Sequence, residues 1–281
     1  MNGRGFALTA IAWTAALILA VPVALIALLW WRQERVVFQP SEPPFPDPGT
    51  TRRVLYEAGD GQNLFAFVVT SGEDTHANRT GLVAFHGNAD LAVALIPWAV
   101  EIAHRTGRIV VLPEYRGYGG LYGEPTVEGA RLDALAAVAM VHDSLGIPHA
   151  NLAYYGHSLG SAIATELAAV APPGVLLLES PFTSARDMAR IIIARPVELV
   201  WRFISRVHYD TEQRVRTLDV PVWVVHGSRD LIVPTRMGRA VYDAAKVKGE
   251  MLIVDDAGHN DVAQTGDDTY WAWIEKALKT R

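Results

Sequence analysis

The sequence predicts an α/β fold with an eight-stranded, mostly parallel sheet, helices on both faces and a short helical cap, preceded by a transmembrane helix. Three observations lead to this prediction. Short β-rich runs alternate with helix-like stretches along most of the chain, which is typical of a parallel sheet covered on both faces. A Gly-x-Ser-x-Gly turn connects one such strand to a helix, and residues 6–31 form an apolar run without charge.

The composition limits the class of protein. The chain has 281 residues, of which 50% are hydrophobic, so it can bury the core of a large α/β domain. The formal net charge is −5 and the sequence has no basic cluster, which argues against a nucleic-acid partner. Because the chain has no cysteine, a cysteine nucleophile, a disulfide framework and a thiolate metal site are excluded.

The apolar N-terminal run predicts a membrane anchor. No charge occurs from Phe6 to Trp31, a stretch longer than the roughly 20 residues that a helix needs to cross a hydrocarbon core. It ends in Trp30 and Trp31 followed by Arg32, as at a membrane interface. A cleaved signal peptide is the alternative, although its apolar region is usually only about 7–15 residues. We therefore expect a single-pass membrane protein. The globular domain is expected on the extracytoplasmic side, because an anchor with a short N-terminal tail before it and a long domain after it commonly inserts that way.

The expected domain organisation has three segments. Residues 1–35 hold the N-terminal tail and the anchor. Residues 36–52 form a linker, because five prolines between positions 40 and 48 disfavour helix and strand ladders. Residues 53–281 form the α/β domain, and residues 179–219 within it form a cap or lid insertion.

The elements of the α/β domain follow in order. The expected strands cover residues 53–57, 64–70, 81–86, 108–112, 151–155, 174–178, 220–226 and 251–254. The expected helices cover residues 91–106, 127–145, 158–171, 235–247 and 267–278, the second with Thr126 as its N-cap. Between the first two strands, Asp60-Gly61 is a hairpin signal, so we expect this pair to be antiparallel.

The insertion contains an apolar helix-like stretch. Its apolar positions are Met188, Ile191, Ile192, Ile193, Val197, Leu199, Val200, Trp201, Phe203 and Ile204. Because the insertion follows a strand end, it is expected either to cover a binding crevice at the carboxyl edge of the sheet or to bury its stripe as an ordinary crossover helix.

The Gly-x-Ser-x-Gly motif connects the fifth expected strand to the next helix. It reads Gly156-His157-Ser158-Leu159-Gly160. In a strand–turn–helix elbow the serine backbone is strained, and the two glycines avoid clashes around it. The following helix directs free N–H groups toward a developing oxyanion. A Gly-rich turn of a nucleotide-binding protein is the alternative, so the motif needs catalytic partners.

Two partners stand in strand-end loops. A serine nucleophile needs a histidine base and a carboxylate that orients the histidine. Asp230 follows the strand at 220–226, and His259 follows the last strand, in the chain order that such a triad requires. The alternative acids are Glu179, Asp255 and Asp256. Three further histidines are expected to pack or to hydrogen-bond loop backbone: His86, His157 and His226.

Two backbone N–H groups are expected to hold the oxyanion. One belongs to Leu159, directly after the serine. The second is assigned to Asn88, in the loop after the third strand, where Gly87 permits a close approach.

With these residues, the chain resembles the α/β-hydrolase superfamily, and within it the membrane-anchored, lysophospholipase-like or serine-aminopeptidase-like members. The resemblance covers about residues 36–280 and rests on Phe85-His86-Gly87-Asn88-Ala89, Glu114-Tyr115-Arg116-Gly117-Tyr118-Gly119, Gly156-His157-Ser158-Leu159-Gly160, Glu179-Ser180-Pro181-Phe182, His226-Gly227-Ser228-Arg229-Asp230 and Gly258-His259. It implies a triad of Ser158, His259 and Asp230, an acyl-enzyme mechanism without cofactor, and an architectural role for the Tyr115-Arg116-Gly117 loop. Asp90 is a departure, because similar proteins often have glycine there.

The leading hypothesis is a membrane-tethered serine hydrolase of carboxylic esters or thioesters. The anchor and the apolar stretch of the insertion favour an amphiphilic or acyl-chain substrate. A peptidase or amidase on the same triad is the first alternative, and a non-catalytic, membrane-tethered binding protein with a hydrolase fold is the second. The mechanism requires neither a metal nor a cofactor.

Overall fold

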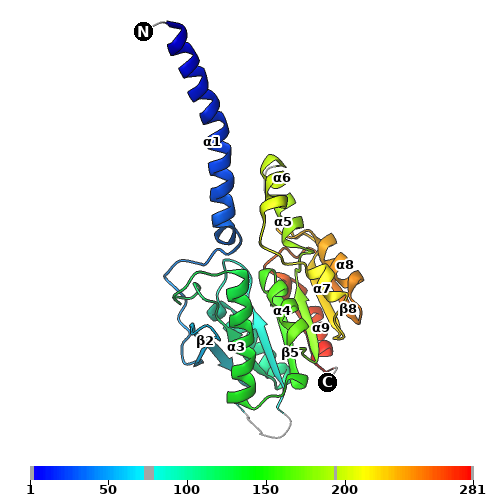
Figure 1. The fold of residues 1–281 in the computed structure, drawn as a ribbon. Coiled ribbons are helices and arrows are strands. Elements are labelled where there is room, and N and C mark those ends of the chain that lie inside the picture. Colours follow the sequence, from blue (N-terminus) through cyan, green and yellow to red (C-terminus); the bar gives the residue numbers. More distant parts are fainter. Residues whose placement is uncertain (1–2, 73–78, 193–194, 280–281) are drawn as a thin grey trace.

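The central sheet has eight strands in the order β1-β2-β4-β3-β5-β6-β7-β8 (Figure 1). The computed structural model describes residues 3–72, 79–192 and 195–279. The strands are β1 Arg52–Glu57, β2 Asn63–Val69, β3 Gly81–Phe85, β4 Ile109–Pro113, β5 Leu152–His157, β6 Val175–Glu179, β7 Val222–Gly227 and β8 Lys248–Val254. Strand β2 is antiparallel to both β1 and β4, and the other pairs are parallel. The predicted hairpin and the mostly parallel sheet are therefore confirmed.

Helices pack on this sheet in two groups. The helices are α1 Gly3–Val37, η1 Ala92–Leu95, α2 Ile96–Thr106, α3 Val127–Leu145, η2 His149–Asn151, α4 Leu159–Val170, α5 Ala185–Ile192, α6 Arg195–Ile204, α7 Thr211–Val215, α8 Thr235–Ala244 and α9 Val262–Lys279. Helix α2 contacts α9, whereas α3, α4, α7 and α8 form a continuous series of contacts. In Figure 1, α3 and α4 lie in front of the sheet and α9 lies behind it.

Two helix starts differ from the predicted boundaries, for local reasons. The stretch expected as one helix from residue 91 begins as η1, and α2 starts at Ile96 with Pro97 in its first turn, where the missing N–H has no cost. Helix α9 begins before residue 267 and contains a non-helical residue, Asp267, with φ 40°. The expected cap of α3 is present, since Thr126 Oγ1 accepts a hydrogen bond of 2.8 Å from the Gly129 N–H.

The centre of the sheet is a rigid support for the strand-end loops. Every residue of β3, β4 and β6 is buried. Such strands read as continuous apolar runs because helices cover both of their faces. Their carboxyl ends therefore hold the following loops at fixed positions along one edge.

The N-terminal helix α1 is continuous from Gly3 to Val37, and its N-terminal end stands away from the sheet (Figure 1). Among the residues that the structure describes, we find no helix with an apolar stretch long enough to span a bilayer. The transmembrane anchor expected from Phe6 to Trp31 is therefore not supported. Instead of ending at Trp31, the helix continues through the charged Arg32, Glu34 and Arg35. The side chains of residues 3–12, 15 and 17–19 lie outside the described residues.

The C-terminal end of α1 is docked on the α/β domain. Gln33 is only 1% exposed, and its Oε1 accepts a hydrogen bond of 2.5 Å from the Arg206 N–H. Glu34 Oε1 accepts a hydrogen bond of 3.2 Å from the Val127 N–H, the first amide of α3. These polar contacts explain why the helix extends past the apolar run into the part expected as linker.

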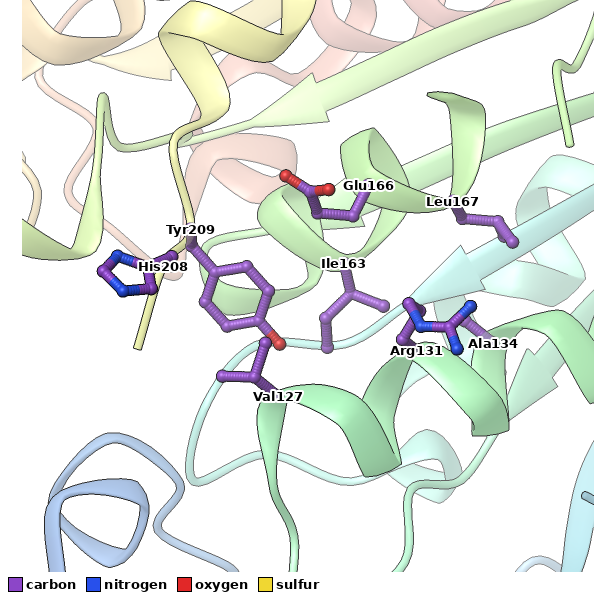
Figure 2. A pocket seen from close by; sticks show the side chains of 8 residues that line it. All are labelled: Val127, Arg131, Ala134, Ile163, Glu166, Leu167, His208 and Tyr209. Atoms are coloured by element: carbon purple, nitrogen blue, oxygen red, sulfur yellow. The ribbon is translucent and has the colours of Figure 1, made fainter. Parts of the chain in front are cut away.

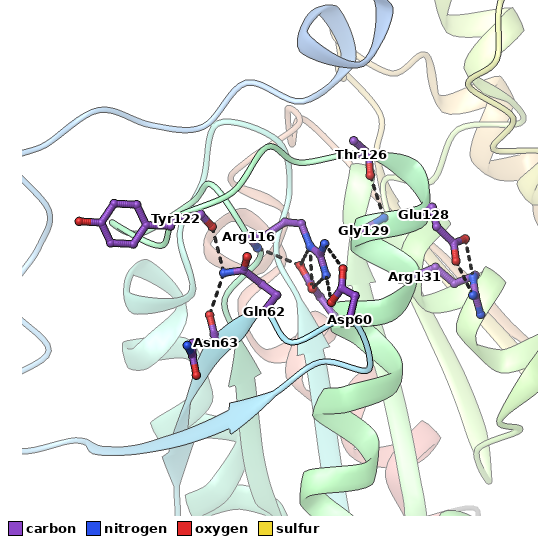
Figure 3. Close-up of polar contacts among 10 residues, drawn as sticks. Asp60, Gln62, Asn63, Arg116, Tyr122, Thr126, Glu128, Gly129 and Arg131 are labelled. Atoms are coloured by element: carbon purple, nitrogen blue, oxygen red, sulfur yellow. Dashed lines mark hydrogen bonds and ion pairs between the residues drawn. The ribbon is translucent and has the colours of Figure 1, made fainter.

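A buried arginine fixes the loop after β4 (Figure 3). Arg116 Nη2 lies 2.6 Å from Asp133 Oδ1 in α3, and its Nη1 lies 2.7 Å from Asp60 Oδ2 in the β1–β2 turn. Burial lowers the pKa of Arg116, but hydrogen bonds to Asp133 and Asp60 outweigh it and raise this pKa above its ordinary value. The loop thus joins three elements, as expected for an architectural role.

In its described residues, the insertion between β6 and β7 contains three helices. Helices α5 and α6 extend beyond the sheet on the side where α1 lies (Figure 1), whereas α7 packs against α4 and α8. Helix α7 therefore has the contacts of a crossover helix, whereas the cap or lid remains a prediction for α5 and α6. Trp201 is buried, while Ile192 and Phe203 are 71% and 83% exposed. Ile193 and the side chains of Val197 and Val200 lie outside the described residues.

Candidate active site

Ser158 occupies a strained turn between β5 and α4. Its φ is 52° and its ψ is −114°, a conformation that residues other than glycine rarely adopt. A Cβ at Gly156 would collide with the backbone of Gly160, and a Cβ at Gly160 would collide with the carbonyl oxygens of Phe85 and His86. The motif therefore needs both glycines because three backbone segments meet at this turn.

His259 and Asp230 form a close pair. His259 Nδ1 lies 2.6 Å from Asp230 Oδ2, and the Asp230 side chain has no exposed surface. Asp230 Oδ1 accepts hydrogen bonds of 2.9 Å and 2.8 Å from the N–H groups of Ile232 and Val233. Because an ionised carboxylate can only accept hydrogen bonds, the proton of the neutral imidazole must be on Nδ1. Nε2 is then free to act as a base.

A second histidine contacts the same carboxylate. His226 Nε2 lies 3.1 Å from Asp230 Oδ2 and 2.9 Å from the carbonyl oxygen of Val233. Burial alone raises the pKa of Asp230, but hydrogen bonds from His226 and His259 outweigh it and hold this pKa well below its usual range. His226 was expected only to pack or to bond loop backbone. The four-residue spacing between His226 at the end of β7 and Asp230 in the following loop was the signal for this contact.

The His259 loop is held from two sides. The Gly258 N–H donates a hydrogen bond of 2.6 Å to Asp261 Oδ1, and His157 Nε2 lies 3.0 Å from the carbonyl oxygen of His259. His259 and Ser158 line the same cavity, and within the described residues no hydrogen bond joins their side chains. Such bonds are often long in ligand-free sites and shorten when substrate binds.

The alternative acids make other contacts in the described structure. Glu179 accepts hydrogen bonds from the hydroxyls of Tyr155 and Tyr270. Asp256 pairs with Arg229 at 2.7 Å, and Asp255 is exposed. The carboxylate that meets His259 is that of Asp230.

The two expected oxyanion donors lie at the nucleophile. Leu159 is the first residue of α4, where a helix leaves its N–H groups without intrahelical acceptors. Asn88 lines the cavities that reach Ser158. Both ends of its side chain are hydrogen-bonded, because Oδ1 accepts from the Gln39 N–H and the Tyr118 hydroxyl, each at 2.8 Å, and Nδ2 donates to the Val37 carbonyl at 2.6 Å.

The loop that carries Asn88 is tied to the end of β4. His86 Nδ1 lies 2.8 Å from the Gly87 carbonyl, and its Nε2 lies 2.8 Å from Glu114 Oε1. Burial lowers the pKa of His86, but Glu114 and the Gly87 carbonyl offset this and raise it above its ordinary value. Asp90 Oδ1 accepts from the Leu91 N–H at 2.8 Å, so this departure from the family pattern closes the loop on itself.

Two cavities meet at Ser158. The apolar cavity, of about 370 Å³, is lined by Ser158, by Met188 and Ala189 of α5, by Trp201 of α6 and by other residues, including Val36 and Val37 from α1. The polar cavity, of about 550 Å³, is lined by Ser158, His259, Glu179 and Trp98, among others. The sequence did not predict that the end of α1 contributes to the site, whereas Glu179, an alternative acid in the sequence analysis, lines the polar cavity without contacting His259.

A third hollow, between α3 and α4, is separate from the nucleophile. It has a volume of only about 60 Å³ and lies among Val127, Ile163, Leu167 and Tyr209 (Figure 2). None of Ser158, Asp230 and His259 lines it. The candidate site is therefore at the two cavities on the carboxyl edge of the sheet.

Known proteins are similar to this chain in sequence or in fold. No family model matches the chain. The chain is 33% identical over 262 residues to the uncharacterized protein Rv2307c of Mycobacterium tuberculosis, which covers 88% of this chain and 87% of that protein. It is 29% identical over 198 residues to the lysophosphatidylserine lipase ABHD12 of Mus musculus, covering 62% of this chain and 47% of that lipase. The Pyrococcus furiosus esterase Pf2001 has the same fold, with a TM-score of 0.68 and 20% identity, covering 86% of this chain and 98% of the esterase.

The sheet order, the elbow and these similarities define the class. The chain belongs to the same family as the mycobacterial protein Rv2307c, and it has the α/β-hydrolase fold. The fold expected from the motifs is confirmed, and the membrane-anchored subgroup stays a prediction.

Proposed function

We propose that the protein is a serine hydrolase that cleaves carboxylic esters through an acyl-enzyme on Ser158. The observation that carries this proposal is the 2.6 Å contact between His259 Nδ1 and Asp230 Oδ2, at a cavity that also reaches the strained Ser158. A buried carboxylate that fixes the tautomer of a histidine beside a serine is the arrangement of a catalytic triad.

Each group has one role in the reaction. His259 Nε2 accepts the proton of the Ser158 hydroxyl as Oγ attacks the acyl carbonyl, and the oxyanion forms at the N–H groups of Leu159 and Asn88. The imidazolium then donates its proton to the leaving oxygen, and the ester bond breaks. Water, deprotonated by His259, then attacks the acyl-enzyme; Ser158 recovers its proton and the carboxylic acid is released. Asp230 remains ionised throughout, because it stabilises the imidazolium without accepting its proton.

The acyl chain of the substrate binds in the apolar cavity. Its lining by the cap helices α5 and α6 and by the end of α1 suits an alkyl chain, which gains about 0.8 kcal/mol for each buried CH₂ group. The lipase and esterase names among the similar proteins support this substrate class. Thioesters of the same acids would place the same chain in this cavity.

A panel of acyl substrates tests the proposal. Purified protein is assayed with p-nitrophenyl esters from acetyl to dodecanoyl, with the matched thioesters and with p-nitroanilides. We expect kcat/KM for the esters to rise with chain length up to the capacity of the cavity, and to exceed that of the anilides. Ser158→Ala should abolish this turnover.

Two outcomes would contradict the proposal. Faster cleavage of the anilides than of the esters would indicate an amidase. Equal rates for the wild-type protein and Ser158→Ala, at the level of buffer alone, would indicate a binding protein with a hydrolase fold.

A further inference from the structure

The polar cavity contains a buried carboxylate that the proposed mechanism does not use. Glu179, the last residue of β6, is only 6% exposed and lines this cavity. Its Oε2 accepts hydrogen bonds of 2.8 Å from the Tyr155 hydroxyl and 2.9 Å from the Tyr270 hydroxyl. Among the residues that the structure describes, no donor meets its Oε1 and no basic side chain pairs with it. One oxygen of this carboxylate is therefore available to a ligand.

The two tyrosines orient the carboxylate without neutralising it. The pKa values of Tyr155 and Tyr270 lie well above the ordinary value of a phenol. Burial is the largest cause, and the negative charge of Glu179 is the next. Both phenols therefore stay neutral and donate their hydrogen bonds. A buried carboxylate without a counter-charge is costly to a fold, and a cationic ligand would remove this cost.

Trp98 contacts both of the tyrosines that bond this carboxylate. The ring of Trp98 lies 4.6 Å from that of Tyr155, centroid to centroid, and its Nε1–H donates a hydrogen bond of 3.0 Å to the Tyr270 hydroxyl. All three residues line the polar cavity, together with the carboxylate of Asp90, and neither lysine nor arginine is among its lining residues in the described structure. Aromatic faces beside carboxylates are a typical environment for ammonium groups.

The position of this cluster relates it to the leaving group of a substrate. The Ser158 N–H donates a hydrogen bond of 3.0 Å to the Glu179 carbonyl, so the nucleophile and the carboxylate lie on adjacent strand ends. The apolar cavity opens from Ser158 on the cap side, and the polar cavity includes His259, which protonates the leaving oxygen in the proposed mechanism. An ester with its alkyl chain in the apolar cavity would place its alcohol part in the polar cavity.

We infer that Glu179, with Trp98, Tyr155 and Tyr270, binds a cationic ammonium group in the alcohol part of the substrate. The preferred substrates are then acyl esters of amino alcohols. This inference rests on the proposed ester hydrolysis and specifies the leaving group.

A pair of isosteric esters tests the inference. Hexanoylcholine and 3,3-dimethylbutyl hexanoate differ in the charge of one end, a trimethylammonium group in place of a tert-butyl group. The ratio of their kcat/KM values is divided by the ratio of their alkaline hydrolysis rates, which removes the difference in intrinsic reactivity. We expect this normalised ratio to favour the choline ester and to fall about tenfold in Glu179→Gln, the size expected for a partly desolvated cation site.

A matched control removes one charge far from the cavity. Asp243→Asn changes an exposed carboxylate on α8 and should leave the normalised ratio as in the wild-type protein. Thermal unfolding of both variants shows whether each is folded. An unchanged ratio in folded Glu179→Gln, or an equal fall in Asp243→Asn, would overturn the inference.

A measurement on the wild-type protein does not depend on any variant. Choline and its neutral isostere 3,3-dimethylbutanol are compared as inhibitors of p-nitrophenyl hexanoate hydrolysis. We expect choline to inhibit at a concentration about tenfold lower. Ester hydrolysis with equal inhibition by the two alcohols would overturn the ammonium site and leave the proposed function standing. If the wild-type protein hydrolyses none of the esters, the proposed function itself fails.

Discussion

Replacing Asp230 with asparagine is expected to lower kcat for ester hydrolysis about 10⁴-fold by reversing the tautomer of His259. The side chain at this position has two unequal ends. Oδ1 accepts the N–H groups of Ile232 and Val233, so only the oxygen of an asparagine fits there. The NH₂ group of the asparagine must then face His226 and His259, where Oδ2 stands in the wild-type protein.

The magnitude follows from this geometry. An NH₂ group donates and cannot accept, so Nδ1 of His259 would become the acceptor and its proton would move to Nε2. Nε2 could then no longer take the proton of Ser158, and the reaction would lose its base. A 10⁴-fold loss corresponds to about 5 kcal/mol of transition-state stabilisation.

Steady-state hydrolysis of p-nitrophenyl hexanoate measures the effect, with circular dichroism to confirm folding. Asp255→Asn is the matched control, because it removes an exposed carboxylate of the same loop as His259, and its kcat should stay within about twofold of wild type. If folded Asp230→Asn keeps activity within tenfold of wild type while Glu179→Gln loses it, the acid assignment is wrong.

Three further predictions concern the groups around the site. Gly238→Ala places a Cβ against the buried His226 ring, so it should lower the free energy of unfolding by about 1–3 kcal/mol and also lower kcat. Arg239→Ala, an exposed position on the same helix, should change neither quantity. Urea denaturation measures the first effect and the ester assay the second. Arg116→Met leaves the carboxylate of Asp133, 2% exposed, without its charged partner and should lower the free energy of unfolding by about 3–5 kcal/mol, measured by urea denaturation. Arg131→Met breaks only an exposed pair with Glu128 and should lower it by less than about 1 kcal/mol. Equal losses in the two variants would refute the buried-pair argument. The pKa of Asp230 is lower in the folded chain than its unfolded value of about 3.9, so its carboxylate stabilises the fold above about pH 4. This contribution is lost as the pH falls toward the folded pKa. Unfolding of the wild-type protein should therefore be more acid-sensitive than that of Asp230→Asn, and parallel pH profiles would contradict this.

The sequence predicted the elements whose causes are local. The alternation of strands and helices, the Asp60-Gly61 hairpin and the Thr126 cap depend on neighbouring residues, and the structure contains them. The glycines at 156 and 160 identified the elbow because a Cβ at either position would collide with backbone. Strand-end loops after β7 and β8 likewise indicated where Asp230 and His259 lie.

Contacts between distant segments escaped prediction. Tyr270 meets Glu179 across 91 residues, and Asn88 meets Val37 across 51 residues. No short sequence pattern encodes such pairs, because they depend on how β6 and α9, or α1 and the β3 loop, are placed by the complete fold. The hydropathy of the N-terminal run predicted a membrane span, and it gave no signal that the polar end of the same helix docks on the domain.

Covalent labelling of the nucleophile tests the central claim most directly. The protein is treated with an alkyl fluorophosphonate, digested and analysed by peptide mass spectrometry, beside Ser158→Ala and His259→Ala. We predict one phosphonylated site, Ser158, in the wild-type protein, no adduct in Ser158→Ala, and labelling at least 10²-fold slower in His259→Ala, as expected when a general base is lost. An adduct on another residue, or an unlabelled Ser158 in a protein that still hydrolyses esters, would contradict the account.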